Sequence, residues 1–203
     1  MTYFDQTLEC APREQIESRQ GRLFLSLMEK LESNNLFYTE KLKQAGLSFG
    51  DIQSLEDLQK VPFTTKSELM EAQEQSPPFG TNLTFPESAY TRFHQTSGTT
   101  GVPLRVLDTE ESWKWWGHCW GFVMAAAGLT AEDRLFVPFS FGPFIGFWAA
   151  VEGSREVSAM MIPGGGRDSL QRLQLMTQLV DRLVRRGQMP YHLSQALMSR
   201  RIS

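Results

Sequence analysis

The order of apolar runs in the second half of the chain constrains the fold more than any other feature of the sequence. The run Leu135 to Phe139 is predicted to be a buried strand, and Gly142 and Pro143 interrupt it. Apolar residues then recur at helical spacing over 145 to 151, and a further apolar run covers 159 to 162. The order strand, helix, strand predicts a β-α-β unit with parallel strands, and therefore an α/β fold.

The first part of the chain is predicted to be helical. Residues 13 to 33 form a helix with one buried face, because apolar residues return there at helical spacing: Ile16, Leu23, Phe24, Leu27 and Leu31. A short helix is expected from Thr39 to Gln44, and Thr64 or Thr65 can cap another. We therefore expect a helical region over 1–88, an α/β region over 89–180 and a divergent tail over 181–203.

A stretch rich in hydroxyls and glycines, TSGTTGVP at 96 to 103, joins two predicted strands, Ala89 to Thr96 and Leu104 to Leu107. Glycines permit unusual backbone angles, and hydroxyls can join backbone N–H groups around a polyanion. The candidate phosphate-binding residues are Thr96, Ser97, Gly98, Thr99, Thr100 and Gly101. The stretch is not a Walker A loop, because no Lys and Ser/Thr pair follows the second glycine. A simple flexible hairpin turn is the alternative interpretation.

Aromatic residues gather in two places. Large side chains at helical spacing predict a core-facing stripe on a helix: Trp113, Trp116, Trp120 and Met124. Asp108 or Thr109 can cap that helix. Phe139, Phe141 and Phe144 surround the break after the predicted strand, at the end of the strand where α/β sheets bind ligands. These three are candidate substrate-binding residues, and a cluster that only covers the sheet edge is the alternative.

Composition argues against several classes of function. Twenty Lys and Arg against 23 Asp and Glu leave a net charge of −3, so no basic field favours nucleic acid. Three histidines and two cysteines show no spacing typical of a zinc site, so no metal site is expected. No secretory leader or apolar run of about 18 residues is present, so no membrane partner is expected. Only Cys10 and Cys119 occur, and we expect a reducing, cytoplasmic location.

The string TSGTTGVP resembles the phosphate-binding signature of the adenylate-forming (AMP-dependent acyl-CoA synthetase) superfamily. Three further segments are similar to the phenylacetate-CoA ligase-like branch: NNLFYTEKLKQAGL, SLEDLQKVPFTTKSEL and DRLFVPFSFGPFIGFWAAVEGSREVSAMMIPGGG. The resemblance extends from about Leu36 to Leu175. It implies an incomplete N-terminal domain of that fold, with a helical region followed by a mainly parallel sheet and flanking helices.

The resemblance also implies a two-step reaction. A small-molecule carboxylate attacks the α-phosphate of ATP to give an acyl-adenylate, and the thiol of CoA then displaces AMP, with Mg²⁺ accompanying ATP. Residues 96 to 101 would follow the β- and γ-phosphates as charge moves onto the departing pyrophosphate. Family loops commonly carry a Lys beside the proline, whereas Val102 and Leu104 flank it here and Arg105 is the nearest cation.

Two classes of function stay open. The first is an acyl- or aryl-CoA ligase, and the second is an inactive fragment that binds phosphate or a partner. The family regions that hold adenosine and carry the catalytic lysine have no counterpart in the sequence, so we assign no catalytic residue. The basic tail over 181–203 departs from the family pattern, as a frameshifted, prematurely ended or short form would. Half of a split enzyme, with a complementing chain, is a further alternative.

Overall fold

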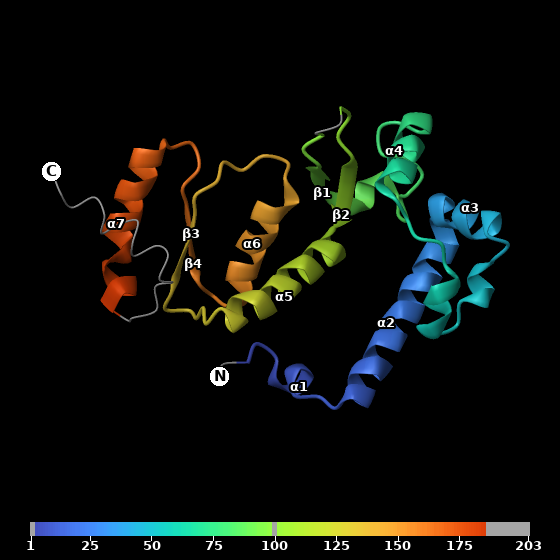
Figure 1. The fold of residues 1–203 in the computed structure, drawn as a ribbon, viewed down its shortest axis with the longest axis horizontal. Coiled ribbons are helices and arrows are strands. Elements are labelled where there is room, and N and C mark those ends of the chain that lie inside the picture. Colours follow the sequence, from blue (N-terminus) through green and yellow to red (C-terminus); the bar gives the residue numbers. More distant parts are fainter. Residues whose placement is uncertain (1–2, 99–100, 186–203) are drawn as a thin grey trace. The chain divides into compact units, whose positions relative to one another are not determined.

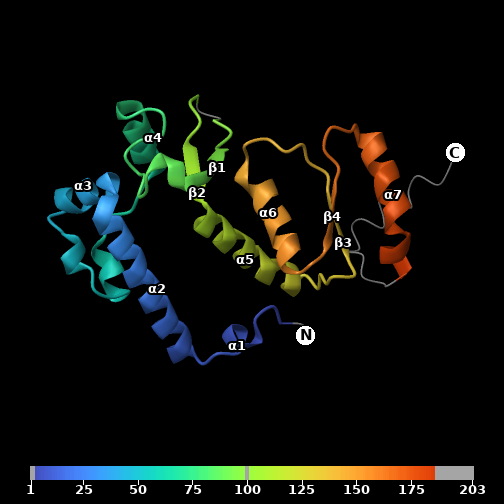
Figure 2. The ribbon, with the colours of Figure 1, turned by 180° about the vertical axis from the view of Figure 1, so that it is seen from behind.

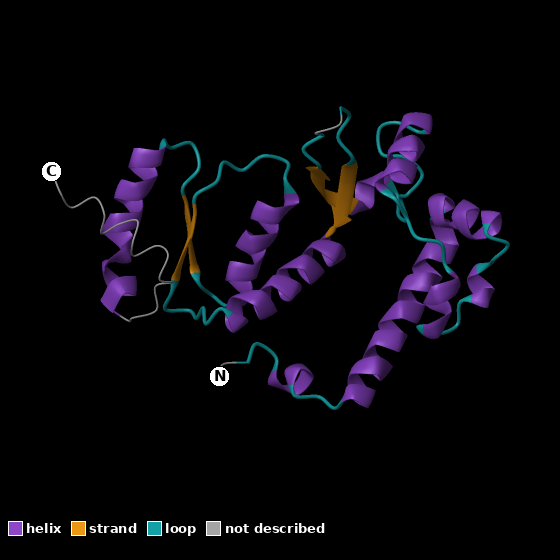
Figure 3. Cartoon of the chain, in the orientation of Figure 1, coloured by secondary structure: helices purple, strands orange, loops and turns teal. Residues whose placement is uncertain are grey.

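The computed structural model describes residues 3–98 and 101–185, and side chains as far as residue 179. Helices predominate over short strands (Figure 1, Figure 3). In chain order the α-helices and strands are α1 (Gln6–Glu9), α2 (Arg13–Asn34), α3 (Leu36–Gln44), α4 (Lys66–Gln75), β1 (Tyr90–Gln95), β2 (Arg105–Thr109), α5 (Glu110–Ala126), β3 (Arg134–Val137), α6 (Ile145–Glu156), β4 (Met160–Pro163) and α7 (Ser169–Arg185). Short 3-10 helices cover Phe49–Asp51, Glu56–Lys60 and Glu87–Ala89.

The chain divides into two compact units. The first comprises 1–133 and 141–160, and the second comprises 134–140 and the residues from 161 onward. The predicted boundaries at 88 and 180 rest on composition and stay a prediction. None of the described helices is long and apolar enough to cross a bilayer.

The strands form two separate two-stranded sheets, although the α/β class is as predicted. β1 and β2 pair antiparallel, with Gln95 opposite Arg105. A single mainly parallel sheet beginning near Ala89 was expected, but the link from β1 to β2 is shorter than the crossover of about a dozen residues that parallel strands need. β3 and β4 do run parallel, since the N–H groups of Met160 and Gly164 donate to the carbonyls of Asp133 and Val137 at 3.1 and 2.8 Å.

Helices α5 and α6 lie side by side in both views of the first unit (Figure 1, Figure 2). They approach closely because residue 153 is a glycine: a Cβ there would lie 2.3 Å from the Cβ of Trp120. Trp113 and Met124 are buried as predicted, whereas Trp116 keeps 42% of its surface exposed. The step of three residues from Trp113 turns Trp116 about 60° around the helix, to the edge of the stripe.

The N-terminal part of the chain is helical, as predicted, but its longest helix buries less of its apolar side than expected. α2 has no buried residue among those described, and Leu23 and Leu27 are 45% and 52% exposed. The predicted burial of one face is therefore wrong, because an apolar stripe shows which side seeks a partner and not that a partner is present. α3 begins earlier than predicted, because Asn35 caps it by accepting from the Tyr38 N–H at 3.0 Å.

In the second unit, α7 follows β4 after a glycine-rich turn. The Asp168 carboxylate accepts from the Gln171 N–H at 2.8 Å and so caps the helix, and the Arg172 side chain donates to the Gly164 carbonyl at 3.1 Å. The backbone is helical as far as Arg185. The remainder of the predicted divergent tail, from residue 186 onward, lies outside the described residues.

Candidate functional site

The hydroxyl-glycine stretch forms the link between β1 and β2, as predicted. Its base is closed by two hydrogen bonds: the Thr96 N–H donates to the Leu104 carbonyl at 2.9 Å, and the Leu104 N–H donates to the Thr96 hydroxyl at 3.0 Å. The Thr96 oxygen is thus occupied in holding the loop together, while its hydroxyl hydrogen can still donate to a ligand.

Gly98 makes the tight turn inside this loop. Its φ is +65°, in the left-handed region that favours glycine, and the Gly101 N–H donates to its carbonyl at 2.8 Å. A Cβ at position 98 would lie 2.9 Å from the Gly101 carbonyl oxygen. The loop conformation therefore excludes any side chain at this position.

The structure describes only some of the other predicted phosphate-binding residues. Ser97 is exposed, and Gly101 has a φ of +120°. Thr99 and Thr100 lie outside the described residues. The six predicted residues stay a prediction as a phosphate site, and a closed base, a glycine turn and an exposed hydroxyl are the parts that the structure describes.

The nearest cation in the sequence, Arg105, is engaged beside the loop. Its guanidinium donates to the Pro78 carbonyl at 3.1 Å. Its backbone exchanges two hydrogen bonds with the Gln73 amide, at 2.6 and 3.1 Å, and these attach β2 to α4. Val102 occupies the position next to the proline and is 55% exposed. The neutral hydroxyl and N–H groups are therefore the donors that the loop offers to a polyanion.

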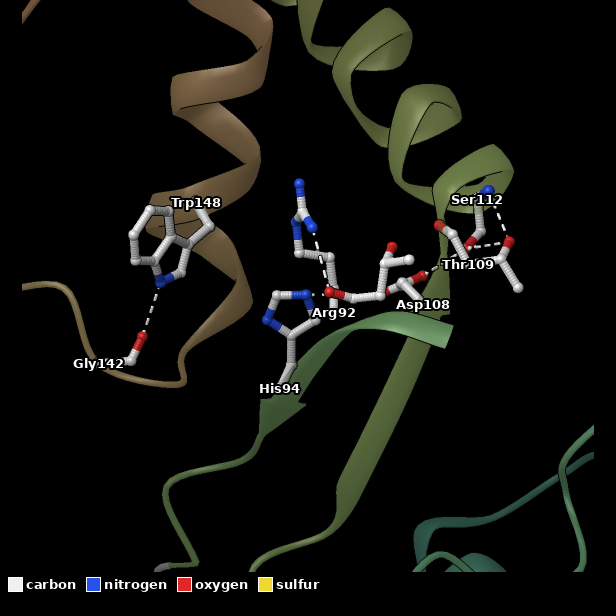
Figure 4. A network of polar contacts seen from close by, with 8 residues as sticks. Arg92, His94, Asp108, Thr109, Ser112, Gly142 and Trp148 are labelled. Carbon is white, nitrogen blue, oxygen red and sulfur yellow. Dashed lines mark hydrogen bonds and ion pairs between the residues drawn. The ribbon is translucent and has the colours of Figure 1, made fainter. Parts of the chain in front are cut away.

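The break before α6 approaches the end of β1, because the Gln95 N–H donates to the Pro143 carbonyl at 2.8 Å. Phe141 packs on Trp148, with ring centroids 4.7 Å apart, and Trp148 donates to the Gly142 carbonyl at 2.8 Å (Figure 4). Phe144 lies 5.1 Å from the Phe147 ring and is 47% exposed. Two of the three predicted substrate residues thus belong to the segment joined to β1.

Phe139, the third predicted substrate residue, belongs to the second compact unit. It is 45% exposed, and its carbonyl lies so close to Gly165 that a Cβ on that glycine would be 2.7 Å away. The aryl pocket formed by Phe139, Phe141 and Phe144 therefore stays a prediction.

A buried polar cluster beside the loop was missed by the sequence reasoning. His94 of β1 is 4% exposed, and its ring stacks on Trp113 of α5 with centroids 5.0 Å apart. Its Nε2 atom lies 3.5 Å from a carboxylate oxygen of Asp108, which is 7% exposed (Figure 4). Asp108 also accepts from the Ser112 hydroxyl at 2.9 Å. Arg92 extends over the Trp113 ring at 5.8 Å.

The hydrogen bonding of this cluster is incomplete. Among the described residues, neither ring nitrogen of His94 has a partner of hydrogen-bonding geometry, and the same holds for Oδ2 of Asp108 and Nε1 of Trp113. Burial lowers the pKa of His94 below 6.5, the Asp108 carboxylate opposes this shift, and the Arg92 guanidinium reinforces it. The sequence signal for this cluster is a histidine two residues before Thr96, the first residue of the loop.

No group of three or more His, Cys, Asp or Glu side chains that could hold a metal ion occurs in the part of the chain that the structure describes. Because Mg²⁺ beside a nucleotide is usually held by one or two carboxylates together with phosphate oxygens, we assign no ligand to the Mg²⁺ that the resemblance implies.

Comparison with known proteins shows that this chain is similar to one part of larger enzymes. No family model matches the chain. It is 29% identical over 169 residues to the phenylacetate-coenzyme A ligase of Escherichia coli K12, covering 83% of this chain and 38% of the relative. It is 30% identical over 159 residues to the enzyme of the same name from Thermus thermophilus, covering 78% of this chain and 35% of the relative. The chain thus spans little more than a third of these relatives.

Solved structures of 2-hydroxyisobutyryl-CoA ligase share the fold. One, in a postadenylation state with R3-HIB-AMP, has a TM-score of 0.77 at 24% identity and matches 87% of this chain but 36% of its own. Another, an open conformation with 2-HIB-AMP and CoA, has the same TM-score and identity, with 40% of its length matched. The fold is therefore that of part of an adenylate-forming ligase.

Proposed function

We propose that this chain, a relative of the N-terminal part of the phenylacetate-CoA ligases of the adenylate-forming superfamily, binds the phosphate chain of ATP through residues 96 to 101. The observation that carries the proposal is the glycine turn at Gly98, whose backbone excludes a side chain inside a loop of hydroxyl and N–H donors. Such a loop stabilises charge on departing pyrophosphate without itself bearing charge.

In the complete reaction a carboxylate substrate attacks the α-phosphate of ATP, and CoA then takes the acyl group from the adenylate. This chain contributes the donors that hold the β- and γ-phosphates, and the segment with Phe141 and Phe144 contributes an aromatic wall for an aryl or acyl carboxylate. The hydrogen bond from Gln95 to Pro143 supports this role, because it joins the two segments at the end of β1.

The chain alone is proposed to bind phosphate without turning substrate over. It spans 35% to 38% of the relatives named above. Rates depend on groups that position the nucleophile and the adenosine, whose proximity effects are worth about 7 kcal/mol or more. A complementing chain that supplies those groups, and a cytoplasmic location, belong to the same proposal.

Titration calorimetry with pyrophosphate tests the binding role through Gly98→Ala. The variant should bind at least about tenfold more weakly, because the added methyl meets the Gly101 carbonyl and distorts the loop. Gly128→Ala is the matched control: its φ is +81°, but nothing lies within 4 Å of the added Cβ, so it carries similar backbone strain away from the loop. Equal affinity of Gly98→Ala and wild type would remove the loop from the proposal.

Two further measurements complete the test. Val102→Lys should tighten pyrophosphate binding about threefold to tenfold, because it places a cation beside the neutral donors. A pyrophosphate-release assay with ATP, phenylacetate and CoA should show no carboxylate-dependent turnover by the chain alone. Turnover of about 1 per second or faster would contradict that part of the proposal.

A further inference from the structure

The cluster of His94, Asp108 and Trp113 is unusual because polar atoms are buried there without complete hydrogen bonding. Leaving a buried donor or acceptor unpaired costs about 1 to 3 kcal/mol. Most natural proteins contain few such groups, and those present often serve a function. Three side chains from β1, β2 and α5 meet in this way beside the candidate phosphate loop, and Figure 4 shows two of them, His94 and Asp108.

The cluster is connected directly to the loop. A single residue separates His94 from Thr96, whose backbone and hydroxyl close the base of the loop. The backbone from His94 to Gln95, the last residue of β1, is extended, so the Cα atoms of His94 and Thr96 are about 7 Å apart. A charge on the loop can therefore interact with the His94 ring through protein, where the effective dielectric constant is lower than in water.

The charged groups around His94 determine how readily its ring takes up a proton. From β2 the Asp108 carboxylate favours the protonated ring, and from β1 the Arg92 guanidinium opposes it, while α5 presents the uncharged Trp113. The acidic residues in the first turn of α5 face other partners: Glu111 pairs with Lys30 at 2.9 Å and Glu110 with Lys114 at 3.9 Å.

Helix α6 packs on α5 and carries charges of its own, which are paired away from His94. The Arg155 side chain pairs with Glu152 at 3.1 Å, and His118 of α5 lies 3.8 Å from Glu156. Asp108 is therefore the acidic group that the structure places against the His94 ring.

We propose that His94 is a positioning residue for the phosphate loop and that binding of a phosphate chain is coupled to uptake of one proton by its ring, against Asp108. The inference rests on the proposed phosphate-binding function and adds its regulation by pH. In the free protein the ring is neutral at neutral pH. Negative charge arriving on the loop favours the imidazolium, so a proton moves from solvent to a ring nitrogen, and no other bond changes.

The sign of the effect follows from linkage. A ligand that raises the pKa of a group binds more tightly as the pH falls through that group's titration range. The ring thus strengthens phosphate binding under mildly acidic conditions, and under alkaline conditions it adds nothing to the affinity. Because pyrophosphate itself titrates, the informative quantity is the affinity of wild type relative to that of a variant without the ring.

The test is calorimetric titration of the full chain with pyrophosphate at about pH 6 and about pH 8, in buffers of different ionisation enthalpy. His94→Gln should bind like wild type at the higher pH and about threefold to tenfold more weakly at the lower one. Wild type should also take up more protons on binding than this variant does. His118→Gln is the matched control, since it removes a histidine of α5 that faces Glu156, and it should behave like wild type.

Nuclear magnetic resonance of the His94 ring in wild-type protein gives a second reading, should the Gln variant fail to fold. Saturating pyrophosphate should move the ring titration to higher pH. Binding with an unmoved titration and a pH-independent affinity ratio would overturn the proton coupling while leaving the proposed function intact. Absence of pyrophosphate binding at either pH would overturn both.

Discussion

The N-termini of helices α4 and α5 have the same kind of cap, but the acid–base pairs beside them differ. At α4, the Glu68 carboxylate accepts from the Thr65 N–H and hydroxyl at 2.6 and 2.9 Å and pairs with Lys41. At α5, one oxygen of Asp108 accepts from Ser112, while the other lies 3.5 Å from His94 without hydrogen-bonding geometry.

The difference separates a structural ion pair from one that can change its charge. Lys41, and after it the backbone and hydroxyl of Thr65, lower the pKa of Glu68 to about 2, so this carboxylate keeps its charge throughout the physiological range. Burial lowers the pKa of His94 instead, so the His94 ring beside Asp108 lacks its second proton at neutral pH. The fully hydrogen-bonded Glu68 carboxylate holds the terminus of α4, whereas the His94–Asp108 pair has unpaired atoms and can change its protonation when a ligand binds.

The largest difference in unfolding free energy is expected when the aromatic ring next to each basic side chain, Trp113 at His94 and Phe37 at Lys41, is removed. Trp113→Ala should cost about 3 to 5 kcal/mol, because the ring is 3% exposed and stacks on His94. Phe37→Ala, which removes the half-buried ring 6.0 Å from the Lys41 ammonium, should cost about 1 to 2 kcal/mol. Urea unfolding measures both, and equal costs would show that the His94–Asp108 pair depends no more on its neighbouring ring than the Lys41–Glu68 pair does.

The two pairs should also lose stability in different pH windows. Because the pKa of His94 is lowered, the unfolded chain takes up a proton first, so stability falls as the pH drops below 6.5 and His94→Gln removes this loss. Because the pKa of Glu68 is lowered from 4.5 to about 2, its contribution is present above 4.5 and is lost as the pH falls toward 2. Thermal melts of His94→Gln and Glu68→Gln against wild type would separate the windows, and a single shared window would refute the distinction.

The smallest difference is expected at the caps themselves. Thr65→Ala and Thr109→Ala should each cost about 1 kcal/mol, because each hydroxyl accepts one backbone N–H, at 3.3 and 3.1 Å. Thr→Ser at each position should recover most of the loss by keeping the oxygen. A cost at Thr109 several times that at Thr65 would place Thr109 in the polar cluster and not only at the helix end.

Local patterns were sufficient for the elements and for the loop. Strand and helix periodicity predicted β1, β3, α6 and α2 to within a few residues. Residue type limited the two caps to Thr64 or Thr65 and to Asp108 or Thr109, and the structure has Thr65 and Thr109. The string at 96 to 103 predicted a glycine-containing link between β1 and β2, because the backbone angle at Gly98 favours glycine. Its phosphate-binding role stays a prediction.

The sequence by itself therefore determined the α/β class, the position of the loop and the resemblance to the adenylate-forming ligases. Only the tertiary structure decided that β1 and β2 pair apart from β3 and β4, that α2 keeps an uncovered apolar side, and that His94 meets Asp108 and Trp113. These features depend on contacts between residues distant in the chain or on the absence of a covering partner. Periodicity reports which side of an element is apolar, but burial and charge state are set by what packs against that side.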